Sequence, residues 1–416
     1  MHMNEYSWTV LLVLAAGLCV QIWLATRHIR NIRHHRDQVP VAFADKISLA
    51  AHQKAADYTI AKTHFGMAGT LLGAGVFMVW TFAGGLNMLD QLLRGMEWSG
   101  IYTGTALILI FMLISMLIDL PMSLYSTFVL EEKFGFNKMT GKLFFKDMLK
   151  GVILAAAIGT PLILVVLWIM EQAGSLWWLY VWAVWMGFSL LLMWAYPRFI
   201  APLFNKFEPL EDGELKNRIT SLLEKCGFSS NGIFIMDGST RSGHGNAYFT
   251  GFGANKRIVF FDTLIKSLSV DETEAVLAHE LGHFRKNHIK KGIALMAAMT
   301  LAGLAILGWL INQDGFYHGL GINEPSTYIG LLLFMIASPL FTFFVSPLFS
   351  AFSRKNEFEA DDYAKQQSNA DNLVSALVKM YEENASTLTP DHLHSVFYDS
   401  HPPAPIRIAR LQGTTS

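Results

Sequence analysis

The chain of 416 residues alternates between long apolar stretches and shorter polar ones. A helix needs about 20 consecutive apolar residues to cross the hydrocarbon core of a bilayer. Seven stretches meet this requirement with few interrupting charges, so each is predicted to be a membrane-spanning helix. These stretches are approximately residues 7–25, 66–88, 101–128, 148–171, 175–200, 288–311 and 326–350.

The polar loops between these spans differ in charge. The loops after the first and third predicted spans are rich in lysine and arginine, whereas residues 90–100, 171–174 and 312–324 together contain one arginine and no lysine. Loops rich in lysine and arginine stay on the cytoplasmic side of a membrane. The N-terminus is therefore predicted to lie outside, and residues 201–287 and the part after residue 351 are predicted to be cytoplasmic.

The polar segment 201–287 has a pattern of its own. Residues 214–225 have helical spacing, and residues 232–236, 246–252 and 257–261 are typical of strands. The sequence thus predicts a mainly α, polytopic membrane protein with about seven transmembrane helices and a small cytoplasmic α/β insert. The expected division is a five-helix transmembrane region with cytoplasmic loops (1–200), the α/β segment (201–287), a transmembrane hairpin (288–350) and a cytoplasmic helical segment (351–416).

Composition supports this assignment and excludes other classes. Hydrophobic residues make up 52% of the chain and charged residues 16%, which is too apolar for an ordinary soluble enzyme. The net charge of −1 indicates no nucleic-acid partner, and two cysteines cannot build a disulfide framework or a cysteine-type zinc site. Asp119 lies late in the third span, where a carboxylate is a functional candidate, although its closeness to the helix end favours contact with water or a capping role.

The candidate chemistry begins at residues 278–284, which read Ala-His-Glu-Leu-Gly-His-Phe. On a helix, His279 and His283 share one face because they stand four residues apart. Two neutral imidazoles in this arrangement can hold one Zn²⁺, and Glu280 can act on water as a general base. Gly282 is expected to leave room beside the metal. The pattern is that of a zinc peptidase.

A catalytic zinc site needs a third protein ligand. His288 is one residue out of register with the third histidine of a metzincin, and it is interpreted as an interfacial histidine. Glu357 is a better candidate, because the seventh span returns residues 353–364 to the same side of the membrane as His279. Asp361, four residues further on, would accept a hydrogen bond from the far nitrogen of a liganding histidine, whereas Glu359 points elsewhere.

These motifs together resemble the type I CAAX prenyl endopeptidases, which are integral-membrane zinc metallopeptidases of the gluzincin group. The resemblance covers nearly the whole chain and implies a metalloendopeptidase with one Zn²⁺, whose helices enclose a large chamber. It also implies a peptide or protein substrate, which in eukaryotic relatives is prenylated. Beside the HExxH segment it rests on Glu131-Glu-Lys-Phe-Gly-Phe-Asn-Lys138, Tyr196-Pro-Arg-Phe-Ile-Ala-Pro-Leu-Phe-Asn-Lys206, Asn246-Ala-Tyr-Phe-Thr-Gly-Phe252, Glu357-Phe-Glu-Ala-Asp361 and Ser400-His-Pro-Pro403 with Arg407.

The resemblance adds residues that spacing alone does not single out. It implies that Asn246, His401 and Arg407 contact substrate or the developing oxyanion. The expected location of this multi-pass protein is the endoplasmic reticulum membrane or a bacterial inner membrane, with the active site toward the cytoplasm, as the loop charges predict. The C-terminus, Leu-Gln-Gly-Thr-Thr-Ser, has no dilysine retrieval signal and so favours a bacterial membrane at least as much.

Two other functions remain open from the sequence. An intramembrane-cleaving metalloprotease would bury the HExxH motif within a span, but residues 271–274 and 285–287 flank it with charge. A transporter or scaffold with a structural zinc would use four protein ligands and would rarely keep a carboxylate positioned as a base.

Overall fold

The computed structural model describes residues 3–228, 230–250 and 257–413. In these residues, seven helices are long and apolar enough to cross a membrane, as predicted. In their most apolar windows only 6–28% of residues are buried inside the protein, so most of this surface faces lipid or an interior space. The spans are α1 (Glu5–His35), α2 (Leu49–Trp80), α4 (Gly100–Tyr125), α5 (Gly141–Gln172), α6 (Trp177–Ala195), α11 (His288–Leu310), and α13 (Thr327–Thr342), which leads into α14 (Ser346–Gln367).

The second span lies earlier in the chain than predicted. Its helix begins after Ser48, whose side chain accepts a hydrogen bond from the Ala51 amide, and it ends at Trp80 rather than near residue 88. Gly84 then adopts a φ of +79°, a left-handed conformation that glycine tolerates, and the chain starts a separate helix, α3 (Gly85–Arg94). Polar residues at its start extend α2 beyond the length that a bilayer needs.

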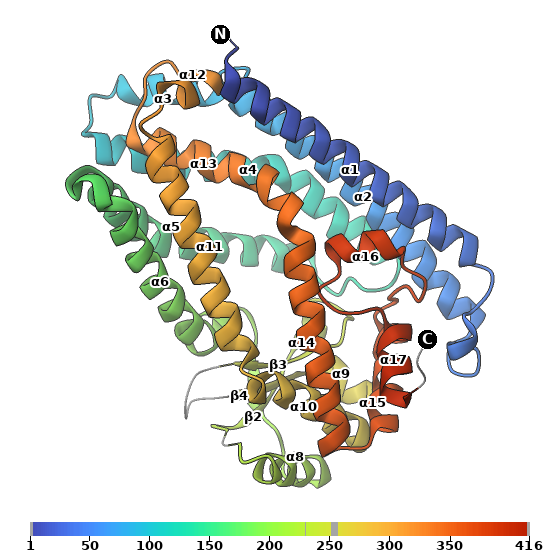
Figure 1. Cartoon of the computed structure of the whole chain (residues 1–416). Coiled ribbons are helices and arrows are strands. Elements are labelled where there is room, and N and C mark those ends of the chain that lie inside the picture. Colours follow the sequence, from blue (N-terminus) through green and yellow to red (C-terminus); the bar gives the residue numbers. More distant parts are fainter. Residues whose placement is uncertain (1–2, 229, 251–256, 414–416) are drawn as a thin grey trace.

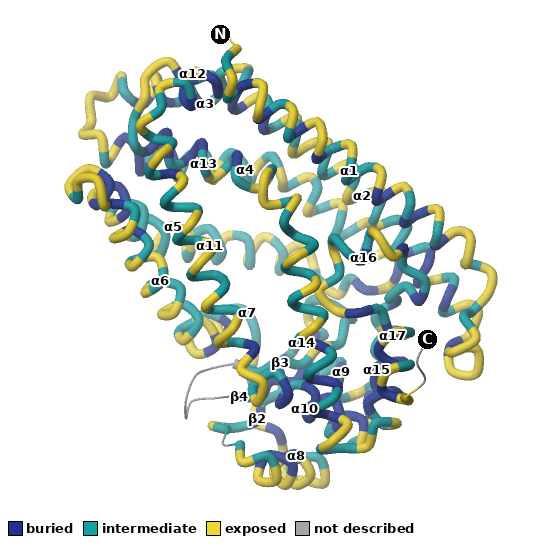
Figure 2. Tube along the Cα trace, viewed as in Figure 1, coloured by how far each residue is buried: buried dark blue, intermediate teal, exposed yellow. Residues whose placement is uncertain are grey.

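The molecule has two packed ends (Figure 1). One apolar cluster joins the ends of the spans near α3 and α12 (Asp314–Gly319), and it includes Leu107, Leu167 and Ile329. A second cluster fills the unit formed by the strands and by α10 (Val270–Arg285), α15 (Ala370–Glu383) and their neighbours. Figure 2 shows buried residues gathered at these two ends, while the middle of the spans is mostly partly buried or exposed. The spans are therefore held together mainly at their ends.

A four-stranded sheet forms part of the second packed end. The strand order is β1-β2-β4-β3, with β2 parallel to β4 and the other pairs antiparallel. The three predicted strands and the predicted helix 214–225 are present, whereas residues 251–252 of the predicted strand 246–252 lie outside the described residues. The strands are β1 (Phe207–Pro209), which the sequence did not predict, β2 (Ile233–Met236), β3 (Ala247–Thr250) and β4 (Arg257–Phe261).

Helices from distant parts of the chain complete this unit. Residues 399–403 separate the last two of them, and a salt bridge of 2.9 Å between Arg27 and Asp391 ties the C-terminal part to α1. The mainly α membrane fold with a small sheet is thus confirmed. The remaining helices are α7 (Ala201–Phe204), α8 (Glu214–Lys225), α9 (Asp262–Ser267), α10 (Val270–Arg285), α15 (Ala370–Glu383), α16 (His392–Tyr398) and α17 (Ala404–Gln412).

Two cavities lie along α2. One, of about 790 Å³, is bounded by α1, α2 and the segment 381–403, and Tyr58, Lys62 and His401 line it. The other, of about 700 Å³, lies between α2 and α4, and Asp119 lines it. Asp119, the carboxylate late in the third predicted span, is therefore exposed at a cavity between two spans.

Candidate active site

The helix that carries the HExxH motif is fixed at its N-terminus by a capping box. The Ser269 hydroxyl accepts a hydrogen bond from the Glu272 amide at 3.2 Å, and the Glu272 carboxylate accepts one from the Ser269 amide at 2.7 Å. Ser375 and Lys379 of α15 also donate to Glu272, each at 2.7 Å. Because Glu272 is buried and fully engaged, α10 has a defined position against α15.

Helix α10 packs against α14 at Gly282. A Cβ atom at this position would lie 2.8 Å from the Cα and 3.0 Å from the carbonyl oxygen of Ala360. The predicted reason for this glycine, room beside the metal, is therefore wrong, because the space is taken by the backbone of α14. Glycine here lets the two helices approach closely enough for Glu357 to face the two histidines.

Replacing Gly282 with alanine is expected to push α14 away from α10. Overpacking of this kind destabilises a protein by about 1–3 kcal/mol, so the midpoint of thermal unfolding and the metal affinity should both fall. Gly292→Ala provides the control, since a Cβ at Gly292 meets nothing within 4 Å. If the two variants unfold at the same temperature and bind metal equally, the close approach of α10 and α14 does not position Glu357.

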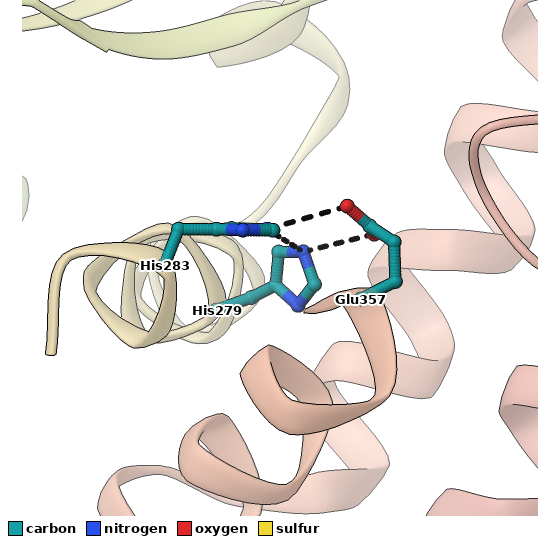
Figure 3. A group of neighbouring side chains, drawn as sticks. All are labelled: His279, His283 and Glu357. Atoms are coloured by element: carbon teal, nitrogen blue, oxygen red, sulfur yellow. Dashed lines mark hydrogen bonds and ion pairs between the residues drawn. The ribbon is translucent and has the colours of Figure 1, made fainter. Parts of the chain in front are cut away.

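Three side chains from α10 and α14 point toward one another (Figure 3). The Nε2 atoms of His279 and His283 are 3.3 Å apart, and the Glu357 oxygens lie 3.4 Å from the first and 3.3 Å from the second. Donors held tetrahedrally at about 2.1 Å from one ion, as zinc ligands are, lie about 3.4 Å from each other. The three donors thus have the spacing of a metal site. His288 is not one of these donors, because its ring contacts Nδ1 of His283, the nitrogen that does not take part in the site.

The carboxylate of Glu357 supports the same assignment. Glu357 is 4% exposed, and among the described residues its Oε2 atom has no hydrogen-bond donor. A buried carboxylate oxygen without a donor is costly unless another group, such as a cation, satisfies it. A metal ion held by His279, His283 and Glu357 would supply that partner.

Asp361 and Arg407 lie behind these ligands. The Nδ1 atom of His279 is 2.9 Å from Asp361 Oδ1, as expected for the carboxylate that orients a liganding histidine. Arg407 donates two hydrogen bonds to Asp361, at 2.9 and 2.6 Å, and its Nη1 lies 3.6 Å from Glu357. Arg407 is only 6% exposed. This differs from the predicted substrate contact, because its guanidinium is already engaged by the buried carboxylates.

The three remaining predicted site residues, Glu280, His401 and Asn246, lie in different surroundings. Burial raises the pKa of Glu280, which the two neighbouring histidines only partly offset, and a raised pKa suits a general base near neutral pH. His401 lies at the ligands, with its Nε2 3.4 Å from Glu357. Asn246 is exposed just before β3, where its side chain accepts a hydrogen bond from the Ala247 amide at 2.8 Å.

A polar network that the sequence did not predict fixes the loop before β3. His244 lies 3.2 Å from Asn384 through Nδ1 and 3.4 Å from Glu131 through Nε2, and Tyr58 donates to Glu131 at 2.6 Å. The pairs that these contacts join are 73 to 140 residues apart in sequence, so no local spacing could reveal the network. The network joins the loop that carries Asn246 to α2 and α15.

Fold and site together define a metallopeptidase embedded in a membrane. Models of known families match residues 28–206 as the CAAX prenyl protease N-terminal region with five membrane helices and residues 209–415 as peptidase family M48. The chain belongs to this family, and it is an integral, multi-pass membrane metalloprotease that acts on peptide or protein substrates.

Individual relatives support this membership. The chain is 41% identical over 302 residues to CAAX prenyl protease 1 homolog of Arabidopsis thaliana, covering 72% of this chain and 71% of the relative. It is 36% identical over 402 residues to CAAX prenyl protease 1 of Saccharomyces cerevisiae, covering 90% and 88%. The crystal structure of S. mikatae Ste24p superposes with a TM-score of 0.91 at 34% identity and covers 99% of this chain and 100% of that one.

Proposed function

We propose that the chain is a zinc metalloendopeptidase that trims the C-terminal residues of prenylated peptides. The observation that carries the metal assignment is the spacing of 3.3 to 3.4 Å between the donors of His279, His283 and Glu357. Two imidazoles and one carboxylate form a donor set that zinc favours, and three protein ligands leave one position open for chemistry. Bound zinc would supply a Lewis acid that polarises the scissile carbonyl and makes water more acidic.

The protein groups supply the remaining chemistry. Glu280 takes the proton of the attacking water and later passes it to the leaving amine. His401, next to Glu357 at 3.4 Å, is positioned to donate a hydrogen bond to the developing oxyanion. Asp361 and Arg407 hold His279 and Glu357 in place. Asn246 is proposed to contact the substrate backbone at the start of β3.

The substrate would bind as an extended chain beside β3. This strand lies at the end of the sheet order, so among the described residues one of its edges has no partner strand and could take an added one. The relatives are named for CAAX prenyl proteins, which carry a lipid near the C-terminus. The cavity of about 790 Å³ that His401 lines offers space next to the metal ligands for such a group.

The location of the site follows from the loops. Lysine and arginine are concentrated in the loops after α1 and α4, so we place the catalytic unit on the cytoplasmic side of an endoplasmic reticulum or bacterial inner membrane. The HExxH helix belongs to the packed unit beside the sheet and not to a span, which disfavours cleavage within transmembrane helices. Membership of a peptidase family disfavours a transporter or scaffold.

The test uses the full-length protein purified in detergent. We expect about one zinc per chain by elemental analysis, and hydrolysis of a farnesylated CAAX peptide in preference to the same peptide without the lipid. A chelator should abolish hydrolysis, and added Zn²⁺ should restore it. Undiminished hydrolysis after the zinc is removed would contradict the zinc mechanism. Equal cleavage of both peptides would contradict only the preference for a lipidated substrate.

A further inference from the structure

His288 lies against the active site although it begins a membrane span. Asn287, between α10 and α11, has a φ of +57°, a left-handed conformation that asparagine adopts more readily than most residues. The resulting turn brings the first residue of α11 back onto the end of α10. His288 is 6% exposed, and its Nδ1 is 3.0 Å from Nδ1 of His283.

The metal assignment decides which of these two nitrogens carries the proton. At 3.0 Å two ring nitrogens form a hydrogen bond only when one of them donates. In the proposed function, on which this inference rests, Nε2 of His283 must keep its lone pair for zinc. A neutral His283 then carries its proton on Nδ1 and donates it, so Nδ1 of His288 is the acceptor.

Glu359 completes the arrangement. With Nδ1 accepting, neutral His288 carries its proton on Nε2, which lies 3.0 Å from Glu359 Oε2. Lys291, one turn further along α11, lies 3.3 Å from the same oxygen and holds the carboxylate. One arrangement of protons therefore satisfies every hydrogen bond from Glu359 through His288 to the free nitrogen of His283.

We propose that His288, held by Glu359, is a positioning residue that fixes the tautomer and the ring orientation of His283. The site then orients its two imidazole ligands in different ways. His279 has a carboxylate, Asp361, directly at Nδ1, whereas the carboxylate for His283 acts through a second imidazole. Groups that orient metal-liganding histidines commonly contribute about 10- to 100-fold in metal affinity.

The experiment measures the zinc affinity of full-length variants in detergent by competition with a chromophoric chelator. His288→Leu removes the acceptor while keeping a side chain of similar size, and its zinc dissociation constant is expected to rise about 10- to 100-fold. His288→Asn keeps an acceptor oxygen close to the position of Nδ1, so it should recover part of the loss. Lys290→Ala, an exposed change two residues away, is the matched control and should bind zinc as the wild type does.

A second readout separates positioning from general destabilisation. The wild type loaded with Co²⁺ should show visible absorption bands that report the geometry of the ligands, and His288→Leu should shift these bands whereas His288→Asn and Lys290→Ala should not. Glu359→Ala, at a partly exposed side chain, should weaken zinc binding as well. Wild-type affinity and spectrum in both His288→Leu and Glu359→Ala would overturn the inference, and a wild type without zinc would instead overturn the proposed function.

Discussion

Glu280→Gln is expected to retain its metal and to lose about 10²- to 10⁴-fold in kcat, the usual contribution of a general base. Glutamine has nearly the same shape as glutamate but cannot accept the proton of the attacking water. The three metal-binding side chains are unchanged in this variant, so its zinc content should equal that of the wild type. Steady-state hydrolysis of the farnesylated peptide and elemental analysis of the same preparation check both parts.

Glu274→Gln is the matched control for this experiment. Glu274 lies on the same helix, pairs with Arg218 at 2.7 Å, and has a partly exposed side chain. Losing a salt bridge of this kind costs about 0–1 kcal/mol, so kcat should stay close to the wild-type value. Full peptidase activity in a zinc-loaded Glu280→Gln preparation would rule out the base role of Glu280, whatever the metal does.

The sequence predicted the parts of the site that depend on spacing and on membrane topology. His279 and His283 lie on one helical face, and an even number of spans returns Glu357 to their side of the membrane. The helix 214–225 was predicted with its observed bounds, because its amphipathic pattern is local. Each of these predictions needed only residues within one element or the count of the spans.

The rest could not be predicted because it depends on contacts between distant residues. Strand β1 has only three residues and contains Pro209, so it has no period to detect. Gly282 gains its role only when Ala360 packs against it. Glu359 was expected to point away from the metal, and nothing in its own segment indicates that it meets His288, 71 residues earlier. The same holds for Arg407, whose carboxylate partner is 46 residues away.

Arg407→Met is expected to destabilise the protein by about 3–5 kcal/mol, the cost of removing one partner from a buried ion pair. Methionine fills a similar volume but leaves Asp361, which is fully buried, without its two charged hydrogen bonds, and it removes the guanidinium that lies 3.6 Å from Glu357. The midpoint of thermal unfolding and the zinc affinity should both fall. Arg407→Lys should recover only part of the loss, since an ammonium cannot form both parallel hydrogen bonds.

Arg410 provides the comparison that decides what Arg407 does. It lies one turn further along α17 and pairs with Asp362 at 2.7 Å, but both side chains are about half exposed, at 48% and 47%. Arg410→Met should therefore cost about 0–1 kcal/mol. If Arg407 instead contacted substrate, Arg407→Met would raise KM while unfolding at the same temperature as Arg410→Met and retaining its zinc. The pattern of unfolding temperature, zinc affinity and KM across the two variants thus distinguishes a residue that holds the metal ligands from one that binds peptide.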